Sequence, residues 1–80
     1  MRIAVLDAGF VYVGRCTIND GFLIIEDARN IRQWGTTKGL GELRKGPTPK
    51  TILDEAGEVF VPISRVIHFL DVDEQAWGKK

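Results

Sequence analysis

Hydrophobic side chains fall into six short runs along this chain, separated by polar and turn-forming residues. The runs are rich in valine, isoleucine, phenylalanine and tyrosine, which favour β-strands, and most of them end at proline, asparagine or aspartate. We therefore predict strands at residues 2–6, 10–18, 22–31, 51–53, 59–61 and 65–72.

Tight connections join neighbouring strands in this prediction. Asn19-Asp20-Gly21 suits a hairpin loop, because asparagine and glycine tolerate positive φ. Segments 7–9 and 54–57 contain similar turn residues and are predicted to play the same part. Pro62 cannot donate to a strand ladder, so it predicts a sharp turn before the last strand.

These elements predict a mainly β fold, a small SH3-like or Sm-like barrel of five to six short antiparallel strands with one long Gly-rich loop. Residues 1–72 would form this single domain and residues 73–80 a C-terminal tail. Trp77 is the exception in the tail, because a tryptophan there more often packs on its own domain or a neighbouring subunit. The predicted core comprises Val5, Val13, Ile18, Leu23, Ile25, Ile31, Val59, Val61, Val66 and Phe69.

A chain of 80 residues supports one modest core, so association with further copies would add stability. Short barrels commonly keep one or two strand edges open, and an open edge invites a second copy. We expect a homo-oligomer that forms by strand pairing or through an apolar face around Phe22 and Ile24.

Charge changes this picture, because the chain is neutral overall but its charges are segregated. Residues 29–50 contain six of the eleven basic residues and one of the eleven acidic ones, Glu42, so this stretch carries five net positive charges. The remainder carries five net negative charges. A balanced total argues against a bulk nucleic-acid binder, whose domain is normally basic throughout.

The same stretch contains four glycines, at positions 35, 39, 41 and 46, together with several threonines. Glycine allows backbone N–H groups to approach an anion, and lysine or arginine supplies the charge, so the loop predicts a phosphate site. Neither a Walker motif nor a dinucleotide fingerprint is present. The predicted ligand-binding residues are Arg32, Trp34, Thr36, Thr37, Lys38, Lys45, Thr48 and Lys50.

Each part of this site also has a plainer interpretation. The glycines and lysines would serve equally as turns and solubilising charges in a solvated loop, and Thr48 and Lys50 lie in a proline-stiffened connector. Trp34 either stacks on a nucleotide base or plugs the end of the barrel. The basic loop could also dock on the acidic remainder of a neighbouring subunit.

We expect neither a catalytic site nor a metal site in this protein. Cys16 has no base placed near it by the sequence, His68 has no partner for a metal site, and no acid pair can be assembled. We predict no catalytic residue, no metal and no cofactor. A lone cysteine indicates a reducing, cytoplasmic compartment, and the apolar runs are too short to cross a membrane.

The stretch from Ile31 to Leu43, IRQWGTTKGLGEL, followed by Gly46-Pro47 and Thr51-Ile52-Leu53-Asp54, resembles a group of short uncharacterised proteins of tailed phages and prophages. More weakly, the opening Met1-Arg2-Ile3 and the segment 61–70 are similar to the ends of Sm-like barrels. The phage resemblance implies a setting inside a host bacterial cell. It suggests a non-enzymatic anti-defence sponge that sequesters a phosphate-bearing nucleotide signal.

Two other functions remain open at this stage. The same cations could run along RNA or DNA in an Sm-like or SH3-like module, with a steep dependence of affinity on salt. The basic loop could instead lie on an acidic host surface, which would make the protein an inhibitor of a host defence factor.

Overall fold

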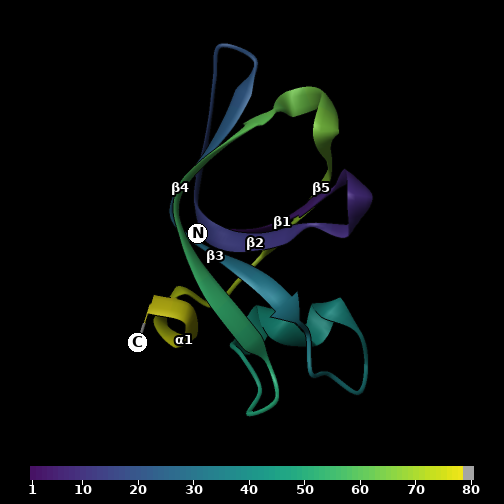
Figure 1. Ribbon diagram of the computed structural model, residues 1–80. Coiled ribbons are helices and arrows are strands. Elements are labelled where there is room, and N and C mark those ends of the chain that lie inside the picture. The colour runs from purple at the N-terminus through teal and green to yellow at the C-terminus, as the bar shows by residue number, and fades with distance from the viewer. Residues whose placement is uncertain (79–80) are drawn as a thin grey trace.

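The computed structural model describes residues 1–78, which form one five-stranded sheet flanked by short helices (Figure 1). The strands are β1 (Arg2–Leu6), β2 (Val11–Asn19), β3 (Phe22–Gln33), β4 (Ile52–Pro62) and β5 (Val66–Asp71). The helices are the 3-10 helices η1 (Asp7–Gly9), η2 (Leu40–Lys45) and η3 (Ile63–Arg65), and the α-helix α1 (Glu74–Gly78). The predicted mainly β class is confirmed.

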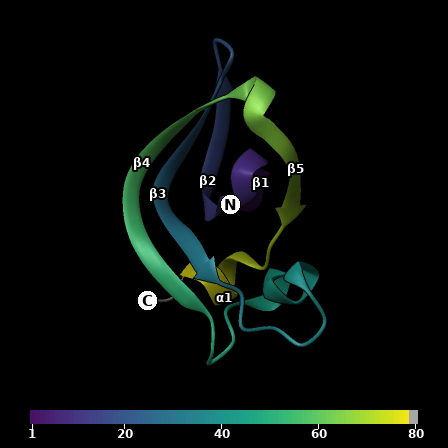
Figure 2. The same ribbon diagram turned by 45° about the vertical axis from the view of Figure 1, so that its right-hand side comes forward.

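All strand pairs are antiparallel, and the order across the sheet is β4-β3-β2-β1-β5. The sheet curves strongly, so that its two edge strands, β4 and β5, lie on opposite sides of the molecule and meet at η3 (Figure 2). The predicted hairpin at Asn19-Asp20-Gly21 joins β2 to β3, with positive φ at Asp20 and Gly21. The predicted sharp turn after Pro62 is η3.

The prediction of two strands at 51–53 and 59–61 with a turn between them is wrong, because β4 runs through both without interruption. The turn-like residues instead occupy bulges, and the β3–β4 register shifts on both sides of the pair Ala28 and Gly57. Gly57 and Asp27 adopt positive φ, 73° and 52°. Such bulges bend a strand without reversing it, which explains the long curved edge.

Gly14 allows the sheet to bend at the centre of β2. A Cβ atom at this position would lie 2.7 Å from Cγ2 of Ile25 and 2.9 Å from the carbonyl oxygen of Glu26. The β2–β3 register also shifts between Val13 and Arg15. A side chain at position 14 would therefore push β3 away at the bend.

The buried residues form two clusters. One contains Ala4, Leu6, Leu23, Ile25, Ala28 and Val61. The other contains Ile3, Val11, Val13, Ile31, Leu43 and Trp77. The prediction that Ile18 belongs to the core is wrong, because this residue is 59 % exposed near the tip of the β2–β3 hairpin.

The second cluster includes a residue from the predicted tail. Trp77 in α1 is fully buried, and its indole N–H donates to the carbonyl oxygen of Leu43 in η2 at 2.7 Å. Trp77, the exception within the predicted tail of residues 73–80, thus packs on its own domain; residues 79 and 80 lie outside the described residues.

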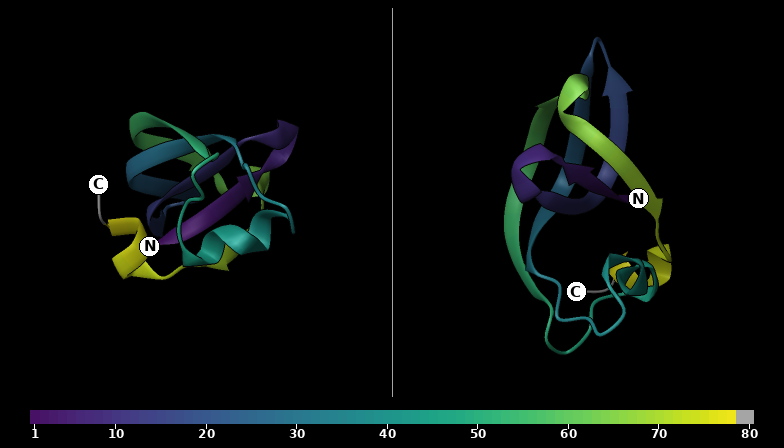
Figure 3. Two further views of the ribbon diagram at one scale, coloured as in Figure 1. Left: turned by 90° about the horizontal axis from the view of Figure 1, so that it is seen from below. Right: turned by 90° about the vertical axis from the view of Figure 1, so that its right-hand side faces the viewer.

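The two ends of the sheet are built differently (Figure 3). We call the end carrying η2 and α1 the covered end, and the end with the β2–β3 hairpin tip and η3 the open end. At the open end the backbone N–H of Ile63 donates to the carbonyl oxygen of Gly21 at 2.9 Å. The large exposed hydrophobic side chains there are Ile18, Phe22, Phe60 and Ile63.

Candidate functional site

The arginines of the basic stretch are tied into the fold. Arg29 donates to the carbonyl oxygen of Trp77 at 2.7 Å, and its guanidinium lies 5.5 Å from the centre of the Trp77 ring. Arg32 forms two hydrogen bonds to the carboxylate of Asp54, at 2.7 and 3.3 Å, which raise the pKa of this guanidinium. Two arginines therefore hold neighbouring structure in place.

Arg44, at the end of η2, binds the strand that precedes α1. Its guanidinium donates to both carboxylate oxygens of Asp71, at 3.0 and 3.1 Å, and to the Asp71 carbonyl at 3.2 Å. These hydrogen bonds, and then the positive charge, hold the pKa of the Asp71 carboxyl below its ordinary value. The backbone N–H of Asp73 also donates to the carbonyl of Arg44 at 2.8 Å. Arg44 thus joins η2 to the end of β5.

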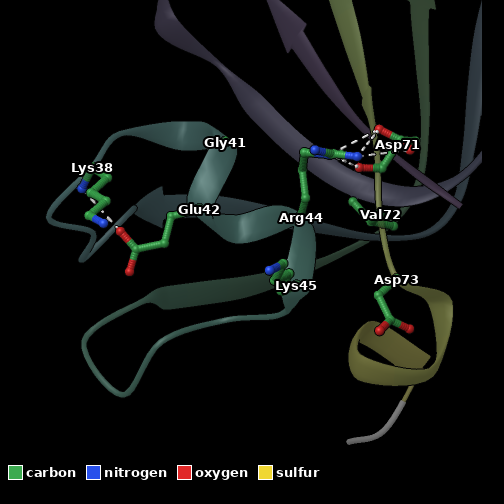
Figure 4. Close-up of a pocket in the computed structure, with 8 residues that line it drawn as sticks. All are labelled: Lys38, Gly41, Glu42, Arg44, Lys45, Asp71, Val72 and Asp73. Carbon is green, nitrogen blue, oxygen red and sulfur yellow. Dashed lines mark hydrogen bonds and ion pairs between the residues drawn. The ribbon is translucent and has the colours of Figure 1, made fainter.

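The lysines behave differently. Within residues 1–78, no carboxylate lies within ion-pair distance of Lys38, Lys45 or Lys50. Lys38 lies just before η2 and Lys45 is its last residue. Both line an open pocket of about 610 Å³ between η2 and the segment linking β5 to α1 (Figure 4). The pocket is lined by Lys38, Gly41, Glu42, Arg44, Lys45, Asp71, Val72 and Asp73.

The carboxylates of this pocket are engaged by donors other than the lysine ammonium groups. Asp71 accepts from Arg44, and Asp73 accepts from the backbone N–H groups at the start of α1, at 3.0 and 3.4 Å. Glu42 accepts from the loop that precedes η2. The ammonium groups of Lys38 and Lys45 are therefore the cations in this lining without a carboxylate partner among the described residues.

In the loop before η2, two neighbouring backbone N–H groups point at one carboxylate oxygen. The backbone N–H groups of Thr37 and Lys38 both donate to Oε1 of Glu42 at 3.0 Å, and the Thr37 hydroxyl lies 3.5 Å from the same atom. An anion does occupy this position, and it is a carboxylate of the same chain.

The other threonines hold the two sides of the long loop together. The hydroxyl of Thr48 donates to the carbonyl of Gly35 at 2.9 Å and accepts from the backbone N–H of Lys50 at 3.1 Å. The hydroxyl of Thr51 donates to the carbonyl of Trp34 at 2.6 Å. Gly35 has a positive φ of 68°, and a Cβ atom there would collide with the backbone of Lys50. Thr48 therefore contributes to the shape of the loop.

The structure brings some of the predicted site residues together and leaves others apart. Lys38 and Lys45 share the pocket, and Thr37 adjoins it through Glu42. Trp34 is 41 % exposed and stands outside the pocket lining. Outside that lining are also Arg32, Thr36, Thr48 and Lys50.

Six lining residues were absent from the predicted ligand-binding set: Gly41, Glu42, Arg44, Asp71, Val72 and Asp73. Glu42 could have been found, since it is the lone acid of a basic stretch with threonine and lysine N–H groups four and five residues earlier. The pairing of Arg44 with Asp71 spans 27 residues and has no local signal.

Cys16 is half-buried in β2, and burial raises the pKa of its thiol, which keeps it protonated. Among residues 1–78, no group of three or more histidine, cysteine, aspartate or glutamate side chains is arranged to hold a metal ion. The helices within the same range are all too short to span a bilayer.

Comparison with known proteins adds no assignment to this site. A scan against models of protein families finds no match to the chain, and a search of curated proteins finds no matching sequence.

Proposed function

We propose that this protein binds a small phosphate-bearing ligand, such as a nucleotide, at the pocket beside η2, and holds it without chemical change. The observation that carries the proposal is that Lys38 and Lys45 line one pocket while no carboxylate of residues 1–78 pairs with them. Lysine ammonium groups are strong phosphate partners, each with three donors.

The size of the pocket and the stiffness of its walls support the proposal. Its volume of about 610 Å³ lies within the ordinary range for small-molecule sites. Arg44 fixes η2 to Asp71, and Trp77 fixes it to α1, so the lysine backbones are held on a braced support. A braced site loses less conformational entropy when a ligand binds.

The finer architecture belongs to the same proposal. The order β4-β3-β2-β1-β5, the bent central strands and the short helix between β4 and β5 favour a small SH3-like or Sm-like barrel. Copies of such a barrel would associate through the strand edges or the exposed Phe22 and Phe60. A second copy would narrow the open pocket and could bring Trp34 to the ligand base.

The resemblance to short phage proteins indicates which ligands should be tested first. A phage protein of this size that retains a nucleotide in the host cytoplasm would act as a sponge for a defence signal. Cyclic nucleotides are therefore the first members of the panel to test, followed by linear mono- and diphosphates.

The experiment is a melting-temperature screen against cyclic and linear nucleotides, followed by calorimetric titration of any ligand found. We expect at least one nucleotide to raise the melting temperature, because a ligand that binds the folded state stabilises it. Lys38→Ala combined with Lys45→Ala should abolish the shift. Lys50→Ala is the matched control, because Lys50 is an exposed lysine of the same loop outside the pocket. No response to any nucleotide, or equal loss in the control, contradicts the proposal.

A nucleic-acid module is the second candidate. It is favoured by the half-exposed Trp34 indole, which lies on the same loop as three lysines that pair with no carboxylate of residues 1–78. Base stacking on an exposed aromatic beside cations is a common mode of single-strand binding. Affinity for an oligonucleotide would then fall steeply with salt, whereas binding of a small ligand would depend on salt weakly. Titrations at two salt concentrations separate the two functions.

A further inference from the structure

The carboxylate of Glu42 is bound by the chain itself in the way that a bound anion would be. One of its oxygens, Oε1, accepts from the backbone N–H groups of Thr37 and Lys38 at 3.0 Å each. The side chain is exposed, so this interaction is open to water and to solutes. We call these two N–H groups and the Thr37 hydroxyl the amide subsite.

We propose that the amide subsite is a second phosphate position and that a phosphate group of the ligand displaces the carboxylate of Glu42 from it. This inference rests on the proposed function and extends it to a ligand class. The preferred ligand carries at least two phosphate groups, one at the amide subsite and another near Lys45.

The placement of the lysines supports a ligand with two phosphates. Lys38 lies before η2 and Lys45 ends it, and both line the same pocket (Figure 4). The flexible Lys45 side chain can therefore bring its ammonium group to a phosphate adjacent to the one at the amide subsite. Lys38 belongs to both parts of the site, because its backbone N–H forms the amide subsite while the residue lines the pocket. Glu42 lines the same pocket, so the subsite adjoins the space that the ligand would fill.

The exchange is favourable on physical grounds. A terminal phosphate group, as in pyrophosphate, presents more accepting oxygens than a carboxylate and carries more charge, so it gains more from two N–H groups and the Lys38 ammonium. Glu42 releases its two hydrogen bonds and moves into water without leaving a buried charge. Displacing the carboxylate costs the same free energy for any ligand that enters the amide subsite. A ligand with a second phosphate near Lys45 gains a further interaction that offsets this cost.

Glu42 would thus have two roles. In the free protein its carboxylate holds the segment before η2 in shape, since Thr37 and Lys38 both donate to it. Towards ligands it acts as an internal competitor for the amide subsite, so that tight binding requires the further contact that a second phosphate makes near Lys45. A substitution that keeps the shape of the side chain but removes its charge separates these roles.

The test is calorimetric titration of the full chain with inorganic pyrophosphate and, separately, with inorganic phosphate. We expect Glu42→Gln to bind pyrophosphate about tenfold more tightly than the natural chain, a change that corresponds to about 1.4 kcal/mol. Glu58→Gln is the matched control, because it removes the same charge from the exposed part of β4. Its affinity for pyrophosphate should equal that of the natural chain. An unchanged or weaker affinity in Glu42→Gln overturns the inference.

A second measurement uses the natural chain, so that its result does not depend on whether the substitution disturbs the loop. Amide resonances of the natural chain are followed by NMR during the pyrophosphate titration. We expect the N–H signals of Thr37 and Lys38 to move the most, and signals that stay in place overturn the displacement of Glu42. If they move while Lys45→Ala has no effect on affinity, the proposed lysine pocket fails and the amide subsite stands. If Lys45→Ala abolishes binding while these signals stay in place, only the amide subsite fails.

Discussion

Large hydrophobic side chains are buried at the covered end of the sheet and exposed at the open end. At the covered end Leu43 and Trp77 are fully buried between η2, α1 and the sheet. At the open end Phe22 and Phe60 are 45 % and 60 % exposed, although they lie on paired strands. The positive charge gathers at the covered end, on segments that apolar packing already holds. A cationic site of this kind needs a hydrophobic anchor, because exposed lysines cannot order a loop by themselves.

The strongest test of this difference is to remove Trp77, the hydrophobic anchor of the covered end. Trp77→Ala should lower the free energy of unfolding by about 3–5 kcal/mol, as expected for loss of a fully buried tryptophan. Phe60→Ala, its counterpart at the open end, should lower it by under about 1 kcal/mol. Urea unfolding followed by circular dichroism measures both, and equal losses would contradict the difference between the two ends.

A milder variant keeps this test informative if Trp77→Ala does not fold. Trp77→Phe retains an aromatic ring but leaves the Leu43 carbonyl without the indole donor, which is bonded at 2.7 Å. We expect a loss of about 1–2 kcal/mol.

The next largest effect on stability is expected at Gly35, in the loop that follows β3. Gly35→Ala should cost about 2 kcal/mol, because the added methyl group meets the Lys50 backbone and φ is positive. Gly41→Ala is the matched control, since no atom lies within 4 Å of its Cβ position. In the same unfolding assay the control should match the natural chain or gain up to about 1 kcal/mol. A tolerated Gly35→Ala would show that the loop is free to move.

Acid should weaken the covered end through Asp71. Its folded-state pKa is held below the ordinary value of 3.8 by Arg44, so its contribution to stability is complete above that pH. The contribution is lost as the pH falls through the folded-state pKa. Asp71→Asn should therefore show a shallower loss of stability below about pH 4 than the natural chain. Asp20→Asn, at the hairpin tip, should keep the natural acid dependence, and the reverse ranking would contradict the role of Arg44.

The smallest effect on stability is expected at the open end, where the proposed association is tested. Phe22→Ser combined with Phe60→Ser should leave the free energy of unfolding within about 1 kcal/mol per residue of the natural value. The same variant should reduce the mass measured by sedimentation, if copies associate there. Phe10→Ser serves as control, because Phe10 is 52 % exposed at the connection between β1 and β2. An unchanged mass in the double variant would assign the association to the strand edges.

The strands were predictable where local pattern and tertiary pairing agree. Apolar runs bounded by turn residues place β1, β2, β3 and β5 to within about two residues, as is usual for element boundaries. The prediction of β4 failed because Asp54-Glu55-Ala56-Gly57 has the composition of a turn. In the structure this segment pairs with β3 and forms a bulge instead. Local chemistry cannot reveal a partner strand that supplies this alternative.

The sequence led to the region of the candidate pocket but not to its contacts. The concentration of charge and glycine led to residues 29–50, which include Lys38 and Lys45. Which cations remain free depends on partners far along the chain, such as Asp54 for Arg32 and Asp71 for Arg44. Hydroxyl groups that suggested ligand contacts at Thr48 are taken up by loop carbonyls, a competition that only the folded backbone decides.

The positions of the two tryptophans make the protein its own optical reporter. Trp77, enclosed in the core, should emit at short wavelength and resist quenching by iodide, whereas Trp34, partly in water, should emit further to the red and be quenched readily. Collapse of the core and events on the basic loop would then appear as separate components of one fluorescence spectrum, without any attached dye.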